Sequence, residues 1–270
     1  MTVPPGAFTA PSIVVGIDGS RAARRAALWA LDEAVGRELP LRLVAAAAPG
    51  ESPDAARTAV HDVGTVVAAA GRPVTVQTEV VSGVPAEALL AASRAAAMIC
   101  VGAVGLKHFE HRVGSTASAL VASAHCPVAV IRGENRPGWI VVELDETPDS
   151  AAVLQAGVEE ARMRDAPLRV LGTWQSDDPG AHDTDERNRL VRSQLDRRLE
   201  TWRHRYPDLD VEPVAVHGSG LPWLSDNADA VALMVVGARN IVAVTELLGP
   251  AGCAALPGTS VLIVDPQRLL

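Results

Sequence analysis

The sequence predicts an α/β protein built from two repeated domains, each with a five-stranded parallel sheet flanked by helices. The first observation is that short apolar runs alternate with longer helical patterns along the chain. The second is an internal repeat: the segment IVVGIDGS from Ile13 aligns without a gap with IVVELDET from Ile140, at an offset of 127 residues. The repeat predicts one domain at residues 1–135 and another at residues 136–270, and both have a common domain size.

The elements of the first domain follow in order from these patterns. Five runs rich in Val and Ile are typical of parallel strands buried on both faces, and they cover residues 13–17, 41–46, 74–81, 98–101 and 128–131. Four helical patterns separate them, at residues 20–39, 53–70, 85–96 and 115–124. We expect Ser20 to cap the first helix and Pro40 to end it. Strands and helices that alternate over short connections predict a parallel sheet with right-handed crossovers.

The composition argues against several classes of protein. The net charge of −8 and the lack of a basic run argue against nucleic-acid binding. No apolar run reaches the roughly 18 residues that a membrane span needs, and the first residues do not have the pattern of a secretory signal. The cysteines Cys100, Cys126 and Cys253 stand in apolar or alanine-rich surroundings. This predicts reduced, buried thiols and a cytoplasmic location.

Two segments are predicted to meet at the carboxyl edge of the first sheet, where open parallel sheets bind their ligands. The ends of the first and fourth strands supply Gly16, Ile17, Asp18, Val101 and Gly102. Glycines let a ligand approach the backbone closely, and an acidic side chain can accept a hydrogen bond from a ribose hydroxyl or an adenine amino group. Residues 114–116 then open a helix whose free N–H groups favour an anion. Together these features predict a nucleotide pocket, with the nucleoside near Asp18 and the phosphates on the loop at residues 102–116.

On these motifs, the whole chain resembles a tandem universal stress protein. The resemblance rests on VVGIDGS at the first strand, VSGVPAEALL before the third helix, and VGAVG…VGSTASALVASAHCPVAVIR at the end of the domain. It implies the family's five-stranded sheet with four helices, of the adenine nucleotide α-hydrolase-like type, and the G-x2-G-x9-G-S/T loop of its ATP-binding members. By position, it implies nucleotide contacts from Asp18, Val44, Ala45, Val101, Gly102, Gly105, Gly114, Ser115 and Thr116. The implied ligand is ATP, with Mg2+ held through the phosphates, and the implied assembly is a homodimer of tandem chains.

The glycine loop departs from the family pattern in both domains. Eight residues, not nine, separate Gly105 from Gly114, and the same spacing recurs from Asn240 to Gly249. The second domain differs further at Asn240, Glu146, Glu246 and Pro250. These changes replace a glycine, add two negative charges and remove one N–H group from the helix start. We therefore expect a loop at residues 239–248 and a second pocket that is degenerate for ATP.

Several of these residues also have a simpler interpretation. Asp-Gly-Ser at residues 18–20 is typical of a turn before a helix, and residues 114–116 would begin a helix with or without a ligand. Lys107 and Arg112 are ordinary surface charges unless a phosphate lies beside them. His108 and His111 are three residues apart, but no cysteine or carboxylate completes a set at metal spacing, so no metal site is predicted.

Three functional hypotheses remain open at this point. The first is a cytoplasmic stress-response protein that binds ATP in residues 1–135 and acts as a sensor or regulator. Because no committed general base or nucleophile is found, its hydrolysis of ATP should be slow or absent. The second is an interaction protein that binds no ATP and recruits a protein partner through its loops and strand edges. The third is a receptor for AMP or cyclic AMP, for which a shorter phosphate loop would suffice.

Overall fold

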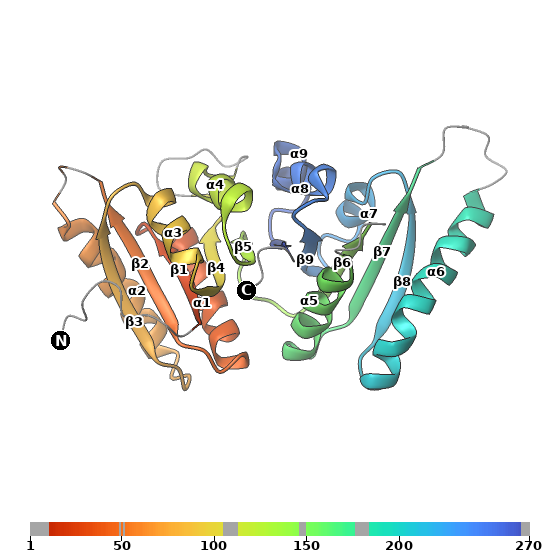
Figure 1. Ribbon diagram of the computed structural model, residues 1–270, viewed down its shortest axis with the longest axis horizontal. Helices are drawn as coiled ribbons and strands as arrows, with labels where there is room; N and C mark the ends of the chain where they lie inside the picture. Colours follow the sequence, from red (N-terminus) through yellow and green to blue (C-terminus); the bar gives the residue numbers. More distant parts are fainter. Residues whose placement is uncertain are drawn as a thin grey trace. The chain divides into compact units, whose positions relative to one another are not determined.

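The structure is a computed structural model that describes residues 11–48, 50, 52–104, 113–145, 150–175 and 184–265 (Figure 1). It divides into two compact units, with the boundary between Asn135 and Arg136. We call them unit 1 and unit 2 and describe each by itself. Within these described ranges, no helix combines the length and the apolar character that crossing a membrane requires.

Unit 1 is an open parallel sheet with helices on both faces. Its strands are β1 (Ser12–Ile17), β2 (Leu41–Ala47), β3 (Val76–Ser82), β4 (Ala96–Gly102) and β5 (Val128–Ile131). Its helices are α1 (Arg21–Gly36), α2 (Asp54–Ala69), α3 (Pro85–Ser93) and α4 (Ser115–Ser123). The strands pair in parallel in the order β3-β2-β1-β4-β5. This confirms the α/β class, and each strand lies within two residues of its predicted run.

Unit 2 repeats this architecture, with parallel strands in the order β10-β9-β6-β7-β8. Its strands are β6 (Trp139–Leu144), β7 (Leu168–Trp174), β8 (Val211–His217), β9 (Val231–Gly237) and β10 (Ser260–Val264). Its helices are α5 (Ser150–Met163), α6 (Thr184–Arg205), α7 (Leu221–Asp226), α8 (Ile241–Leu248) and α9 (Pro250–Ala255). By the repeat, β6 corresponds to β1 at the offset of 127 residues. At the glycine motif the offset is 135 residues, as from Gly102 to Gly237, so β9 corresponds to β4 and α9 to α4. Helix α8 takes up the eight residues that correspond to 106–113 of unit 1.

Two glycines at strand ends show which helices cover which face of unit 1. A Cβ atom added to Gly16 would lie 2.7 Å from Leu89 Cδ1 of α3 and 3.2 Å from Val101 Cγ1. A Cβ added to Gly102 would lie 2.6 Å from Ala22 Cβ of α1. Because Val101 and Gly102 are neighbours in β4, they face opposite sides of the sheet, and so do α1 and α3. After β1 the chain continues to β2 on one side of β1, and after β4 it continues to β5 on the other side of β4. The strand order therefore reverses between β1 and β4.

The end of α1 differs from the prediction, because the helix stops before Pro40 is reached. Its last residue is Gly36, Arg37 is the C-cap, and Glu38 takes a left-handed conformation with φ of 56°. Asp165, at the corresponding position of unit 2, has φ of 49°. A left-handed residue after a helix turns the chain away from the helix axis. The turn, not the proline, therefore ends this helix.

Two expectations about burial are confirmed only in part. Strand β3 was expected to be buried on both faces, but its residues are half-buried or exposed. It stands at the end of the unit 1 strand order, and such strands are less covered than central ones. Cys100 and Cys126 are free thiols and are buried as expected, whereas Cys253 is half-buried. Burial raises the pKa of the Cys126 thiol to about 12, which keeps it in the unreactive thiol form.

A buried ion pair is repeated at the end of the first helix of each unit. In unit 1, Arg37 Nε lies 3.0 Å from Glu33 Oε2. In unit 2, Arg164 Nη1 pairs with Glu160 Oε2. Both glutamate side chains are 0% exposed, against 27% for Arg37 and 14% for Arg164. A carboxylate buried to this degree depends on a charged partner, so each unit requires its arginine.

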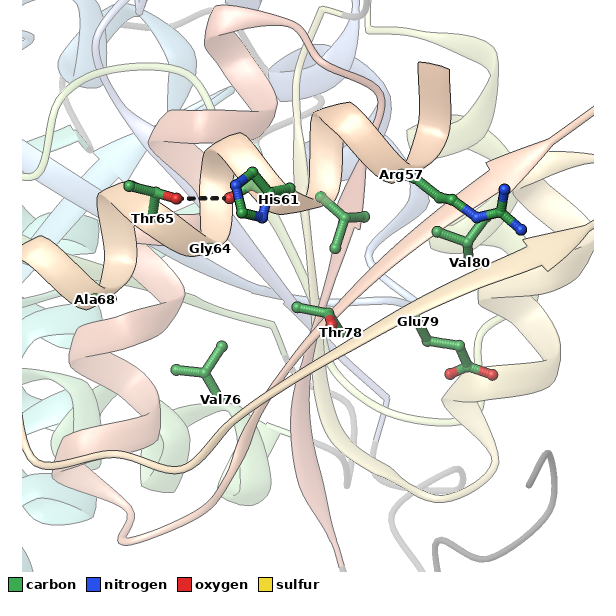
Figure 2. Close-up of a pocket in the computed structure, with 10 residues that line it drawn as sticks. Arg57, His61, Gly64, Thr65, Ala68, Val76, Thr78, Glu79 and Val80 are labelled. Carbon is green, nitrogen blue, oxygen red and sulfur yellow. Dashed lines mark hydrogen bonds between the residues drawn. The ribbon is translucent and has the colours of Figure 1, made fainter. Parts of the chain in front are cut away.

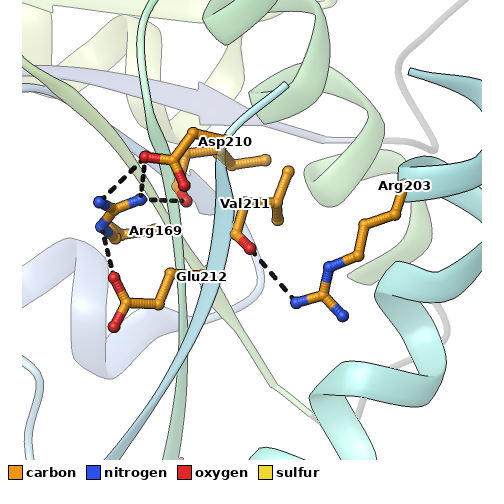
Figure 3. A network of polar contacts seen from close by, with 6 residues as sticks. Arg169, Arg203, Asp210, Val211 and Glu212 are labelled. Carbon is orange, nitrogen blue, oxygen red and sulfur yellow. Dashed lines mark hydrogen bonds and ion pairs between the residues drawn. The ribbon is translucent and has the colours of Figure 1, made fainter. Parts of the chain in front are cut away.

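Ion pairs also fasten the outermost strand of each sheet to its neighbour. In unit 1, Arg42 Nε of β2 lies 2.9 Å from Glu79 Oε2 of β3. In unit 2, the corresponding Arg169 of β7 lies 3.0 Å from Glu212 Oε2 and 3.2 Å from Asp210 Oδ2, as Figure 3 shows. These contacts hold the register of the outer strands through side chains as well as through the backbone.

Candidate nucleotide site

The predicted site residues of β1 and β4 lie on adjacent strands at the carboxyl edge of unit 1. Gly16 and Ile17 are the last residues of β1, and Asp18 follows them. Val101 and Gly102 are the last residues of β4, which pairs with β1. The structure thus brings the two predicted segments together at the point where strand order reverses. Such reversal points are where open α/β sheets bind their ligands.

Helix α4 begins at the same edge. Gly114 is its N-cap, and the Gly114 N–H donates to the carbonyl of Ala103, directly after β4, at 2.8 Å. Ser115 and Thr116 form the first turn, whereas Gly105 lies outside the described residues. The first turns of α1 and α4 contain no acidic residue. Their amino ends therefore favour an anion at this edge.

Asp18 already has a structural role in the turn between β1 and α1. Its Oδ1 accepts the N–H of Ser20 at 2.9 Å, and Ser20 Oγ accepts the N–H of Ala23 at 3.0 Å. Gly19 between them has φ of 81°. These are the turn and the helix cap that Asp-Gly-Ser predicts without any ligand. Because Asp18 is exposed, a nucleotide contact from it would be added to this structural role.

Helix packing accounts for both strand-end glycines. The Cβ of any larger residue at Gly102 would lie 2.7 Å from the carbonyl carbon and 3.0 Å from the carbonyl oxygen of Ala22. At Gly16, it would collide with Leu89. Helix α1 can therefore approach the sheet closely because Gly102 lacks a side chain, and the lack of one at Gly16 leaves room for the tip of Leu89 from α3. The contact of these glycines with a ligand stays a prediction.

The apolar residues predicted to line the adenine belong to the hydrophobic core. Val44 and Ala45 lie in β2, opposite Gly16 and Ile17 of β1. The side chains of Ile17, Val44, Ala45 and Val101 are 5%, 3%, 1% and 4% exposed. Their first role is to pack the sheet edge on which the site would stand. An adenine contact from them also stays a prediction.

The corresponding edge of unit 2 is occupied by carboxyl groups and by a helix. The expectation of a loop at residues 239–248 is wrong from Ile241 onward, because α8 begins there. Asn240, which replaces the second glycine of the motif, is the N-cap of this helix, and its Oδ1 accepts the N–H of Ala243 at 3.1 Å. Ser219 Oγ, before α7, donates to Glu246 Oε2 of α8. The replacement of that glycine thus has a structural reason.

Glu143 is the residue of this edge that sequence reasoning missed. It stands at the position of Gly16, and the alignment of IVVELDET with IVVGIDGS contains the signal, a charged residue inside a buried strand. Glu143 is 8% exposed. Burial raises the pKa of its carboxyl to about 7, the charges of Glu246 and Asp145 act in the same direction, and a hydrogen bond from Asn240 opposes them. The charges of Asp145 and Glu246 oppose the binding of a phosphate at this edge, and Glu143 adds to them when it ionises.

A surface groove of about 610 Å³ lies elsewhere in unit 1, between α2 and β3 (Figure 2). None of the predicted nucleotide-binding residues that the structure describes lines it. Gly64, in the middle of α2, contributes to the room in this groove. A Cβ added there would lie 3.9 Å from Thr78 Cγ2 and 4.0 Å from Leu43 Cδ1, which are ordinary contact distances.

Replacing Gly64 by alanine is expected to stabilise unit 1. Alanine is favoured over glycine inside a helix by about 0.5–1 kcal/mol, and its methyl group fits here. The measurement is the shift of the unit 1 unfolding transition in scanning calorimetry. Gly157→Ala in α5 is the matched control, because its Cβ would lie 2.0 Å from Val142 Cγ2 and should destabilise unit 2. A lower transition for Gly64→Ala would contradict the open geometry around this glycine.

Comparisons with known proteins agree with the fold. Residues 10–132 match the family model described as the universal stress protein family. The chain is 44% identical to the universal stress protein Rv2028c of Mycobacterium tuberculosis and 41% identical to Rv3134c of the same organism. Both alignments cover 96% of this chain and 98% of the relative. The structure is similar to that of a universal stress protein from Archaeoglobus fulgidus, with a TM-score of 0.68 over 96% of this chain and 97% of that chain at 12% identity, a level that supports the fold alone.

Proposed function

Because the chain belongs to the universal stress protein family, we propose that unit 1 binds an adenine nucleotide, with ATP as the first candidate. In this proposal, the protein is a cytoplasmic sensor or regulator of the stress response that hydrolyses the nucleotide slowly or not at all. One observation carries the proposal. The ends of β1 and β4 and the amino end of α4 converge at the point where strand order reverses.

The charges at this edge of unit 1 suit an anionic ligand. The first turn of α4 offers the N–H groups of Ser115 and Thr116, and α1 begins with Arg21. Unit 2 serves as an internal comparison, because Glu143 and Glu246 stand at its equivalent edge. The bound nucleotide would bring Mg2+ with its phosphates, and the ion would neutralise part of their charge. The chain itself would hold the phosphates at α4 and the nucleoside near the β1 end.

We expect binding without rapid catalysis because the acidic residue at this edge, Asp18, already holds its own turn. The Asp18 carboxylate accepts a hydrogen bond from the backbone of its own turn. A general base must reach the proton that it removes, in a suitable protonation state. A carboxylate that fixes a turn is better suited to orienting a ligand than to moving a proton. We therefore assign Asp18 a binding role.

The test is calorimetric titration of ATP, AMP and cyclic AMP into the wild type and the Gly114→Asp and Asp18→Ala variants. Aspartate is a favourable N-cap, so Gly114→Asp should keep or improve α4 while its charge repels phosphate. We expect Gly114→Asp to weaken ATP binding at least about tenfold, or about 1.4 kcal/mol. Asp145→Ala is the change in unit 2 that corresponds to Asp18→Ala. It is the matched control and should leave the affinity for ATP unchanged.

Two outcomes would count against this proposal. One is an ATP affinity that is the same in the wild type and in Gly114→Asp. The other is no binding of any of the three nucleotides at millimolar concentration, which would favour the interaction protein that recruits a partner. Tighter binding of AMP or cyclic AMP than of ATP would keep the site and change the ligand.

A further inference from the structure

Glu143 occupies a position in unit 2 at which three segments of the chain meet. It lies in β6, one residue before the end of the strand, and is 8% exposed. The turn between β8 and α7 packs against it, since a Cβ added to Gly220 would lie 3.2 Å from Glu143 Oε2. The third segment is the start of α8, where the side chain of Asn240 hydrogen-bonds to Glu143.

Helix α8 is held on unit 2 by polar contacts at both of its turns. Asn240 links Glu143 to the backbone, because the same side chain accepts the N–H of Ala243 at 3.1 Å. One turn further on, Glu246 accepts a hydrogen bond from Ser219, whose Oγ also accepts the N–H of Leu221 at 3.1 Å. Apolar contacts add to this attachment through the buried side chains of Ala243 and Leu247. The attachment of α8 therefore has a polar part, at Asn240 and Glu246, and an apolar part, at Ala243 and Leu247.

The charged groups around Glu143 are mostly negative. Asp145 follows the end of β6, and Glu246 of α8 adds a second negative charge that acts on this carboxyl. On β7, Arg169 is on the same face as Glu143 but is engaged with the carboxylates of Asp210, directly before β8, and Glu212 of β8. Arg239, before α8, is exposed. The neutral carboxyl is thus compatible with the site, whereas the carboxylate would stand among like charges in a buried position.

Helix α6 brings one positive group near this edge, because Arg198 Nη1 donates to the backbone carbonyl of Asp145 at 3.4 Å. Helix α5 covers the opposite face of β6, as the contact of Gly157 with Val142 shows. Its Glu160 is paired with Arg164. On α7, Asp226 is the last residue and is exposed. From β9, the strand on the other side of β6, the residues VALMVVG contribute no charge.

We propose that Glu143 is a pH-sensitive latch, which holds α8 on unit 2 while its carboxyl is protonated and releases α8 when it ionises. The hydrogen bond from Asn240 is available to both forms and favours the carboxylate, so it opposes release. The protonated carboxyl holds α8 because it places no charge opposite Glu246. Ionisation places the negative charge of Glu143 on β6 opposite that of Glu246 on α8. Movement of α8 away from β6 lowers this repulsion and exposes the Glu143 carboxylate to water. This device belongs to unit 2 and does not depend on nucleotide binding in unit 1.

The direction of the pH dependence follows from the raised pKa of Glu143. The pKa of its carboxyl is 4.5 when the side chain is exposed and about 7 when α8 lies in place on unit 2. The stability that the protonated form contributes is full below pH 4.5 and is lost as the pH rises through about 7. Opening of α8 is therefore expected to increase as the pH rises from 4.5 to about 7 and to level off at higher pH.

The test is hydrogen exchange of the amides at residues 241–248 in the full chain, without nucleotide, at pH 5.5 and pH 8.5. Glu143→Gln keeps the shape and the hydrogen bond but cannot ionise, so it is the reference at each pH. Dividing the wild-type rate by the Glu143→Gln rate cancels the intrinsic effect of pH on exchange. We expect this ratio to rise at least about tenfold from pH 5.5 to pH 8.5, while the ratio for α5 stays constant.

Glu246→Gln gives a second, independent test. It removes the charge that faces Glu143 from α8, so the opening should move to higher pH or become smaller relative to wild type. A ratio that is the same at both pH values would overturn the proposal. A parallel rise for α5 would also overturn it, because it would mean that the whole unit unfolds instead of releasing α8.

Discussion

Replacing Arg164 by methionine is expected to destabilise unit 2 by about 3–5 kcal/mol. The substitution keeps much of the aliphatic volume but leaves the Glu160 carboxylate, which is 0% exposed, without its arginine. An uncompensated buried charge costs far more than a surface ion pair contributes. Urea denaturation followed by tryptophan fluorescence is a suitable measurement, because four of the five tryptophans (Trp139, Trp174, Trp202 and Trp223) lie in unit 2.

The controls for this prediction use the repeat. Arg37→Met should have a similar effect on unit 1, because Glu33 is buried to the same degree. Adding Glu160→Gln to Arg164→Met should recover a large part of the loss, since the buried charge is then removed with its partner. A loss below about 1 kcal/mol in Arg164→Met, the value of an exposed pair, would show that the carboxylate finds solvent or another donor.

The second large effect is expected for Gly102→Ala, which should destabilise unit 1 by about 1–3 kcal/mol through overpacking. The added methyl group would meet the backbone of Ala22 at 2.7–3.0 Å, and a helix backbone cannot yield as a side-chain tip can. Moving α1 also moves its amino end away from the β4 end, so nucleotide affinity should fall together with stability. Calorimetric unfolding and ATP titration on the same sample measure both quantities.

Gly237→Ala is the matched control for this substitution, because Gly237 holds the equivalent position in unit 2. Its Cβ would lie 3.3 Å from Val153 Cγ2, a side-chain atom that can shift by a few tenths of an ångström. We expect a smaller loss of stability there and no change in ATP affinity. Equal effects at the two positions would contradict the packing explanation, and lost binding with full stability in Gly102→Ala would assign this glycine to the ligand.

The strands could be predicted from the sequence because buried parallel strands leave a strong pattern. Runs such as the one from Ile13 to Ile17 admit few other interpretations, and Ser20 caps α1 as expected. The end of α1 could not be predicted, because Glu38 takes a left-handed conformation with no glycine or asparagine to signal it. The ion pair of Glu33 and Arg37 has the spacing of an ordinary surface pair, and its burial depends on tertiary packing.

The candidate site was predictable where it depends on topology and unpredictable where one residue has two roles. The repeat and the strand order bring Asp18 and Gly102 to one edge, as predicted. In unit 2, the loss of a glycine at Asn240 indicated a damaged motif, but the same asparagine is a strong helix cap. Helix α8 therefore stands where the sequence had predicted a loop. Glu143 could not be predicted from the glycine motif, because it replaces Gly16 inside a strand and lies outside the loop that the motif defines.

The ion pairs on the outer strands also bear on aggregation. A strand at the end of a sheet presents unpaired backbone groups that can recruit another strand, which is the first step toward amyloid-like fibres. Glu79 on β3 and Glu212 on β8 would bring like charges together if two copies stacked edge to edge. Pro213, inside β8, has no N–H group to offer an incoming strand. The residues that fasten the outer strands are thus also expected to disfavour pairing of these edges with another copy of the chain.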